Sequence, residues 1–163
     1  MHMQNGRGIR RHEGFTLMEL IVAMVIVGVL AAIAIPSYSA YVLKSHRTEA
    51  KSALLDAASL EERFFSTSNT YSANPSDLGY GAVPFPFTVG NGYYQITGFN
   101  PQLPVAPGPG NPSGTPATFT ITAQAINQQV NDTACATFSV NSAGVQTAQT
   151  SGGADNTVNC WQN

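Results

Sequence analysis

The chain changes its hydrophobic and polar pattern sharply twice. A short polar and basic stretch, residues 1–14, precedes a run from Phe15 to Ile35 in which only Thr16 and Glu19 have polar side chains. At 1.5 Å per residue, this run would form a helix about 31 Å long, which matches the hydrocarbon core of a bilayer. The pattern therefore predicts a membrane-length helix close to the N-terminus.

A second helical pattern follows Pro36. Apolar residues recur there at steps of three and four, namely Ala50, Leu54, Ala57, Leu60 and Phe64. Most charged residues of this segment fall off that stripe, namely Glu49, Asp56, Glu61, Glu62 and Arg63. We interpret residues 15–66 as one long helix whose rear half needs a cover from the rest of the chain. Pro36 either permits a bend or local melting of this helix, or is a kink that packing tolerates.

The remaining residues predict strands and loops. Alternation of apolar and polar residues is clean in 117–126 and again in 135–140, and the segments 93–99 and 145–149 also have strand character. The segment 100–116 is rich in Pro and Gly and is predicted to be a surface loop. The pattern favours an α+β fold in which the long helix packs on an antiparallel sheet of about four strands.

Charge is sparse and unevenly distributed. The chain has 163 residues and a net charge of −2. Arg7, Arg10 and Arg11 precede the apolar run, which predicts a cytoplasmic N-terminus and an exported remainder. After Arg63 the sequence contains no Lys, Arg or His. That part of the chain cannot form the basic groove that phosphate attraction needs, so a nucleic-acid partner is not favoured.

The sequence contains two cysteines, Cys135 and Cys160. On the exported side of a membrane, two cysteines favour a disulfide. The alternative is a pair of free thiols, and a metal site is weaker still because two sulfurs do not complete a tetrahedral shell.

Candidate catalytic chemistry is weak. His46 is the only histidine after the first fourteen residues, and it is expected on the exposed part of the helix beside Arg47. Glu61 and Glu62 are adjacent, so on a helix they suit solvent better than acid–base catalysis. Lys44, Arg47 and Lys51 form a small basic face, which is expected to be solvated or to meet acidic residues of a neighbouring subunit. We expect no enzyme, cofactor or metal site.

The stretch Gly14-Phe15-Thr16-Leu17-Met18-Glu19 and the apolar run that follows it resemble the processing motif of prepilins. The segment 37–80 and the cysteine pair are similar to type IV pilins, closest to the PilE-like minor pilins. The resemblance implies the type IV pilin fold. It also implies a leader peptide at 1–14, a transmembrane and fibre-core helix at 15–36, the amphipathic half of that helix at 37–66, and a globular head at 67–163.

The same resemblance implies how such a subunit matures. A prepilin peptidase would cut between Gly14 and Phe15, and the new N-terminus at Phe15 would be methylated. The inner-membrane assembly machinery would then draw the subunit from the lipid into a fibre of pilin subunits. The resulting function would be pilus biogenesis, with twitching motility and cell adhesion.

Glu19 is a carboxylate inside the apolar run, and its burial needs a partner. The family resemblance implies that this glutamate meets the N-terminal amine of a neighbouring subunit and so sets the axial register. The alternative is a side chain that extends to the cytoplasmic interface.

Three other functions compete with this interpretation. A pseudopilin of a type II secretion system would share the leader and the helix. A DNA-receptor pilin used in natural transformation is disfavoured by the near-absence of positive charge on the head. An ordinary signal-anchored periplasmic enzyme has neither a recognisable site nor a need for cleavage before its apolar run.

Overall fold

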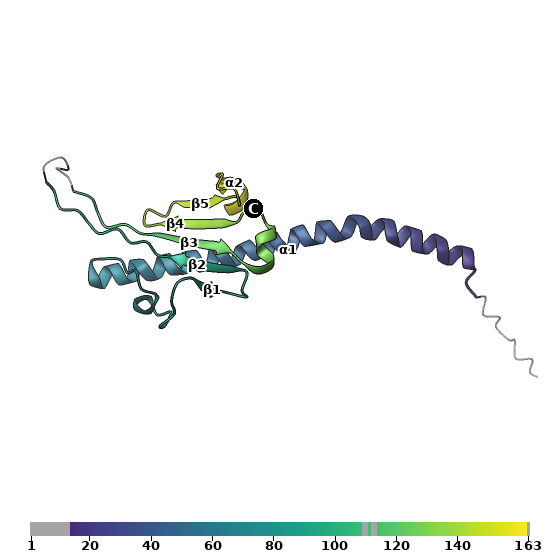
Figure 1. The fold of residues 1–163 in the computed structure, drawn as a ribbon, viewed down its shortest axis with the longest axis horizontal. Coiled ribbons are helices and arrows are strands. Elements are labelled where there is room, and N and C mark those ends of the chain that lie inside the picture. Colours follow the sequence, from purple (N-terminus) through teal and green to yellow (C-terminus); the bar gives the residue numbers. More distant parts are fainter. Residues whose placement is uncertain (1–13, 109–110, 112–113, 163) are drawn as a thin grey trace, which may run out of the picture. The chain divides into compact units, whose positions relative to one another are not determined.

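The computed structural model describes residues 14–108, 111 and 114–162. Its elements run in the order α1, η1, β1, β2, β3, η2, β4, β5 and α2 (Figure 1). The chain divides into two compact units, residues 1–40 and 41–163, and each is considered by itself. The leader that the sequence predicts at 1–14 lies almost entirely outside the described residues.

Helix α1 spans Leu17–Ser68 and continues through Pro36. Its bounds differ by two residues at each end from the predicted helix 15–66, which confirms one continuous helix with two patterns. In the second unit, Ala50, Leu54 and Ala57 are fully buried, while Leu60 and Phe64 are partly buried against the same core. The predicted apolar stripe of the rear half is therefore the face of α1 that the head covers.

Five antiparallel strands form one sheet in the order β1-β2-β3-β4-β5, each paired with the next along the chain (Figure 1). The bounds of the strands are β1 Phe87–Val89, β2 Tyr94–Gly98, β3 Thr120–Ala125, β4 Thr137–Asn141 and β5 Gln146–Gln149. The α+β class and the antiparallel sheet are confirmed. The sheet has one strand more than the four predicted, because β1 contains only three residues between turn-forming segments.

Alternate residues of the strands fill one core with the rear half of α1. This core contains Tyr94, Ile96, Ile121, Ala123, Phe138, Val140 and Ala148 from the sheet. Aromatic rings join the strands to one another, for example Tyr94 and Phe138 with ring centres 5.7 Å apart. Each buried side chain of this size contributes about 1.5–3 kcal/mol to folding.

Short helices close the two ends of the sheet. Helix η1, Pro75–Leu78, follows α1, and Leu78 is buried in the core. Helix η2, Asn127–Asn131, links β3 to β4, and helix α2, Thr157–Trp161, ends the described chain beside β5.

The β1–β2 turn is tied to α1 by Glu49. Its carboxylate accepts hydrogen bonds from the backbone N–H and the side-chain amide of Asn91, at 2.9 and 2.6 Å. Gly90 has φ +56°, and a Cβ there would lie 2.5 Å from Glu49 Oε2. The left-handed backbone at this position favours glycine, and a side chain there would also displace the end of Glu49.

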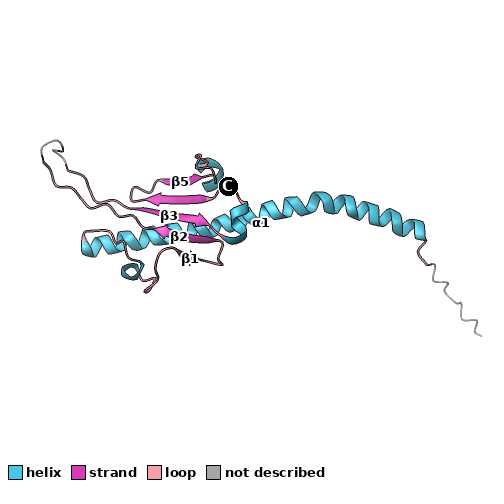
Figure 2. Cartoon of the chain, in the orientation of Figure 1, coloured by secondary structure: helices cyan, strands magenta, loops and turns pink. Residues whose placement is uncertain are grey.

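The segment between β2 and β3 extends beyond the sheet as a narrow ribbon (Figure 2). Isolated antiparallel bridges pair Gln102 with Thr118 and Val105 with Thr115. Leu103 is 74 % exposed. The prediction of a surface segment at 100–116 is confirmed, and the two sides of the segment also hydrogen-bond to each other.

Candidate assembly and processing site

The start of α1 coincides with the predicted processing motif. The Thr16 hydroxyl accepts the backbone N–H of Glu19 at 3.2 Å, and the Thr16 carbonyl accepts that of Leu20 at 3.2 Å. Thr16 is therefore the N-cap of the helix, and Thr-x-x-Glu has the residue types of a capping box. The carboxylate of Glu19 also lies in the first turn, where the helix dipole favours a negative charge.

Gly14 and Phe15 lie just before this cap, and both are exposed. Phe15 is 85 % exposed, and a Cβ added to Gly14 would meet nothing within 4 Å. Neither packing nor a positive φ within the described chain requires a glycine at position 14. The bond between these two residues is therefore exposed in the described chain.

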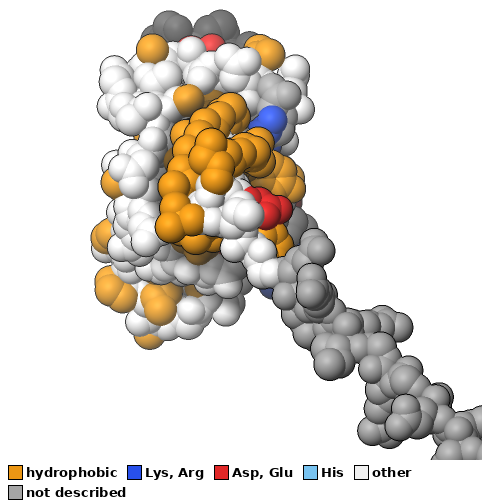
Figure 3. Space-filling view, turned by 90° about the vertical axis from the view of Figure 1, so that its right-hand side faces the viewer, with side chains coloured by type: hydrophobic (Ala, Val, Ile, Leu, Met, Phe, Trp, Pro, Cys, Tyr) orange, Lys and Arg blue, Asp and Glu red, His pale blue; other side chains and the backbone are white. Residues whose placement is uncertain are grey.

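The front half of α1 is apolar and uncovered. Its large side chains from Phe15 to Ile35 are 45–85 % exposed, and Glu19 is the only charged residue among them. In the described part of the chain, α1 is the one helix long and apolar enough to cross a membrane. Figure 3 shows hydrophobic side chains gathered into a continuous surface with few charges beside it. A surface of this extent needs lipid or protein to cover it.

Pro36 lies within this half of α1, and two serine hydroxyls bond the neighbouring turns. Ser37 Oγ donates to the Ile33 carbonyl at 3.1 Å, and Ser39 Oγ donates to the Pro36 carbonyl at 2.9 Å. The helix continues through the proline although Pro36 has no N–H to donate to the carbonyl four residues earlier.

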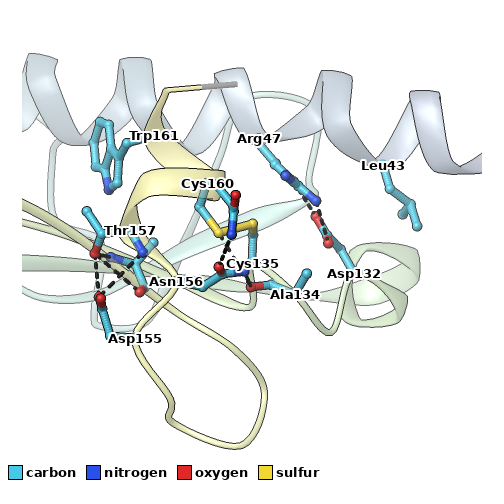
Figure 4. The surroundings of a disulfide bond; sticks show 12 residues. Leu43, Arg47, Asp132, Ala134, Cys135, Asp155, Asn156, Thr157, Cys160 and Trp161 are labelled. Atoms are coloured by element: carbon cyan, nitrogen blue, oxygen red, sulfur yellow. Dashed lines mark hydrogen bonds and ion pairs between the residues drawn. A yellow bond between two sulfur atoms is a disulfide. The ribbon is translucent and has the colours of Figure 1, made fainter.

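The rear half of α1 carries a buried ion pair to the head (Figure 4). Arg47 donates from Nε to Asp132 Oδ2 at 2.7 Å and from Nη2 to Asp132 Oδ1 at 2.9 Å. The two side chains are 14 % and 4 % exposed. Gln129, which is fully buried, donates to the Leu43 carbonyl at 3.0 Å and lies 3.1 Å from Asp132 Oδ2.

Two of the three residues of the predicted basic face thus bond to other residues of the same chain. Arg47 pairs with Asp132 of the same chain, and Lys51 Nζ donates to the Trp161 carbonyl at 3.0 Å. Burial, followed by the charges of Arg47 and Lys44, lowers the pKa of Lys51. His46 is also not on an exposed face, because it is half-buried, stacks on Tyr93 with ring centres 3.4 Å apart, and lies 3.0 Å from a Gln129 oxygen.

The position of Glu61 differs most clearly from the prediction, which placed it in solvent. Its side chain is fully buried, although its polarity placed it off the apolar stripe. One carboxylate oxygen accepts the Ser72 backbone N–H at 3.0 Å, and the other has no hydrogen-bond partner among the described residues. Burial raises the pKa of Glu61 to about 6, and the nearby Glu62 and Asp77 add to the rise. Glu62, in contrast, is exposed and accepts a bond from Tyr71.

Cys135 and Cys160 form a disulfide, as the sequence predicts, and both are fully buried. The bond joins the start of β4 to α2, beside the Arg47–Asp132 pair (Figure 4). Its sequence separation of 25 residues corresponds to about 3.5 kcal/mol of stabilisation in the chain-entropy account. The bond holds the C-terminal segment on the sheet, where Trp161 Nε1 donates to the Thr147 carbonyl at 2.8 Å.

Comparison with known proteins places these features in one family. Residues 36–139 match the model of the family described as type IV minor pilin ComP, DNA uptake sequence receptor. The chain belongs to this family of type IV minor pilins. Residues 9–35 match the prokaryotic N-terminal methylation motif, which covers the cap, Glu19 and the apolar half of α1. The sequence-based assignment to the type IV pilins is confirmed.

Curated relatives match less than half of this pilin. The type IV major pilin protein PilA of Myxococcus xanthus is 39 % identical over 70 residues, covering 43 % of this chain and 32 % of the relative. Fimbrial protein EcpC of Eikenella corrodens is 34 % identical over 71 residues, covering 44 % of this chain and 46 % of the relative. The type IV wide pilus major component PilA4 of Thermus thermophilus is 33 % identical over 70 residues, covering 43 % and 53 %. The chain spans about a third to a half of these relatives.

The network beneath the head was not predicted from the sequence. Asp132 and Gln129 lie more than eighty residues from their partners on α1, so spacing carries no signal of the contact. The signal that was available is the isolation of Asp132, since it is one of only three charged residues after Arg63.

Proposed function

We propose that this pilin is a fibre subunit that is cut between Gly14 and Phe15, methylated at Phe15, and assembled through the front half of α1. The observation that carries the proposal is the uncovered apolar surface from Phe15 to Ile35, which begins directly at the motif. A membrane-anchored precursor has lipid around this surface, and a fibre would replace the lipid with the same surface of other subunits.

Glu19 would set the axial register between neighbouring helices in the fibre. Cleavage creates an amine at Phe15, one helical turn from the carboxylate of Glu19. Within the described chain, Glu19 has no cationic partner, and a charge buried without one is costly. An amine from a neighbouring subunit would compensate the charge only at one axial offset between helices.

The proposed surroundings follow from the same arrangement. The precursor would span the inner membrane with its N-terminus in the cytoplasm and its head in the periplasm, and the mature subunit would reach the extracellular fibre. Its partners would be the prepilin peptidase, the assembly machinery and other pilins. The fibre would support twitching motility and adhesion.

The test compares Glu19→Ala with a matched acid on the same helix, Glu62→Ala, which lies outside the apolar half. Both variants should accumulate in the membrane at the level of the parent protein. Glu19→Ala should be depleted from sheared filaments by at least about tenfold, which is what the loss of one compensated charge predicts. Glu62→Ala should enter filaments normally. Normal entry of Glu19→Ala would disprove the register mechanism.

A second candidate function is DNA reception, and the family match favours it. The ComP model describes a DNA uptake sequence receptor and covers most of the head. The distribution of charge opposes it, because Arg47 is bonded to Asp132 and the sequence has no basic residue after Arg63. Lys44 and Arg63 are exposed on α1, but two cations neutralise few phosphates.

DNA binding by the full chain separates the two functions. A receptor that uses phosphate contacts should bind duplex DNA with an affinity that falls steeply as salt rises. We expect at most weak binding, which Lys44→Ala with Arg63→Ala abolishes. Tight binding that keeps its strength in the double variant would show a DNA-receptor function that does not depend on these cations.

A further inference from the structure

The face of the sheet that points away from the buried core is polar and carries no charge. One row crosses all five strands through successive register pairs, and its members are Thr88, Gln95, Gln124, Thr137 and Gln149. A second row, Thr122, Ser139 and Thr147, crosses β3 to β5. These residues alternate with the buried residues of the same strands, so amides and hydroxyls cover the outer face.

The first row ends in a cleft of about 280 Å³. Its polar lining includes Gln124, Thr137, Gln149 and Ser151, and its apolar lining includes Val130 and Ala136. Val130 is 55 % exposed, although it is a hydrophobic residue beside a polar surface. The cleft therefore offers a small apolar contact surrounded by neutral hydrogen-bonding groups.

The polar groups of the cleft are available to a ligand. Within the described residues, the side chains of Gln124, Thr137, Gln149 and Ser151 make no hydrogen bond to another residue. Amides and hydroxyls both donate and accept hydrogen bonds, so they match a ligand that carries hydroxyl groups at its edge. Among the described residues that line the cleft none is charged, which leaves a phosphate, carboxylate or ammonium group without a counter-charge.

We propose that this cleft binds a neutral carbohydrate. A sugar ring has C–H groups on its faces and hydroxyls at its edges, and Val130 with Ala136 would contact the former while the glutamines bond the latter. The cleft is slightly smaller than the roughly 300–1,000 Å³ of drug-sized sites, so it would hold one ring or the end of a chain. The polar row toward β1 would continue the contact along a longer glycan. This site does not depend on how the subunit is processed or assembled.

The experiment uses the full chain, labelled with ¹⁵N, in a zwitterionic detergent that has no sugar headgroup. Three neutral trisaccharides serve as probes: maltotriose, cellotriose and chitotriose. At least one should shift the side-chain amide signals of Gln124 and Gln149 in a saturable manner, and the affinity should not change when salt is raised, because no ion pair forms.

The double variant Gln124→Ala with Gln149→Ala should weaken binding by about tenfold or more, since it removes two neutral hydrogen-bonding groups. The matched control is Gln146→Ala, because Gln146 is an exposed glutamine at an alternate position of β5, outside the cleft. Thr137→Val, which keeps the shape of the side chain, should give a smaller loss. Unchanged thermal unfolding of each variant would show that its head is intact.

Three results would overturn the proposal. The first is the absence of a saturable shift with all three sugars. The second is unchanged sugar affinity in the double glutamine variant. The third is a salt-sensitive shift of the same amides by duplex DNA that displaces the sugar, which would make the outer face a nucleic-acid surface instead.

Discussion

The two halves of α1 share one helical backbone but differ in what covers their apolar side chains. The front half exposes nearly all of its large apolar side chains, whereas the rear half buries Ala50, Leu54 and Ala57 beneath the sheet of the same chain. The front half has one carboxylate without a partner in the described chain, and the rear half pairs its arginine with Asp132. Folding of the chain therefore buries the apolar face and pairs the arginine of the rear half. The apolar side chains and the carboxylate of the front half need lipid or other subunits for the same purpose.

The largest expected effect is at the boundary of the front half. Gly14→Leu should block cleavage almost completely, because a bulky side chain would occupy the approach to the scissile bond. Intact-mass measurement of the membrane protein should then find the first fourteen residues still attached. The matched control, Thr16→Ser, keeps the cap hydroxyl and should be processed normally. Normal processing of Gly14→Leu would contradict the role given to the glycine.

In the rear half, Arg47→Ala should cost about 3–5 kcal/mol of unfolding free energy, because it leaves Asp132 buried without its cation. Chemical denaturation of the full chain measures this loss. Lys44→Ala, an exposed cation on the same helix, should change the free energy by no more than about 0.5 kcal/mol. A loss for Arg47→Ala as small as the control's would mean that the pair does not hold the helix to the head.

The same substitution, Leu to Ala, should have different effects in the two halves of α1. Leu54→Ala should destabilise the head by about 2–5 kcal/mol, since Leu54 is fully buried. Leu30→Ala should leave the unfolding free energy within about 0.5 kcal/mol, since Leu30 is 62 % exposed in the chain. Filament yield is the second measurement, and we expect Leu30→Ala to reduce it. Equal destabilisation of the head by both changes would contradict the claim that only the rear half of α1 is packed against it.

The smallest predicted effect concerns Glu61 and depends on pH. Its folded pKa of about 6 lies above the ordinary value of 4.5, so its protonated form is favoured by folding. Its contribution is fully present below pH 4.5 and is lost as pH rises through 6, by about 2 kcal/mol. Glu61→Gln should therefore stabilise the head at neutral pH and change little in acid.

Denaturation of Glu61→Gln at several pH values measures this difference, with the exposed neighbour in Glu62→Gln as the control. The control should not reproduce the pH dependence. A stability difference between Glu61→Gln and the parent protein that stays constant from acid to neutral pH would show that Glu61 does not titrate on folding in this range.

Sequence reasoning succeeded where the physical signal is local. The extent of α1 follows from an apolar run of membrane length and the periodic apolar stripe after it, and strands β2 to β5 follow from alternation or β-branched content. Strand β1 was missed because three residues next to Pro86 and Gly90 are too few to show a period. The disulfide was expected from two cysteines and an exported head.

The misses concern contacts whose partners are distant in the sequence. Glu61 continues the four-residue spacing of Ala57 on the buried stripe, but its polarity suggested solvent, and only the Ser72 backbone amide in the following segment explains its burial. Likewise, the basic spacing of Lys44, Arg47 and Lys51 indicates a cationic face, and the acid that accepts Arg47 is 85 residues away.

The central claim is that neighbouring subunits cover the front half of α1. The direct measurement is maleimide labelling of intact filaments that carry a single added cysteine, Ile26→Cys in the front half or Ser52→Cys on the exposed side of the rear half. Both positions are exposed in the chain by itself. We expect the cysteine at position 26 to stay unlabelled in filaments, whereas the cysteine at position 52 should react. Equally rapid labelling of both would contradict the central claim.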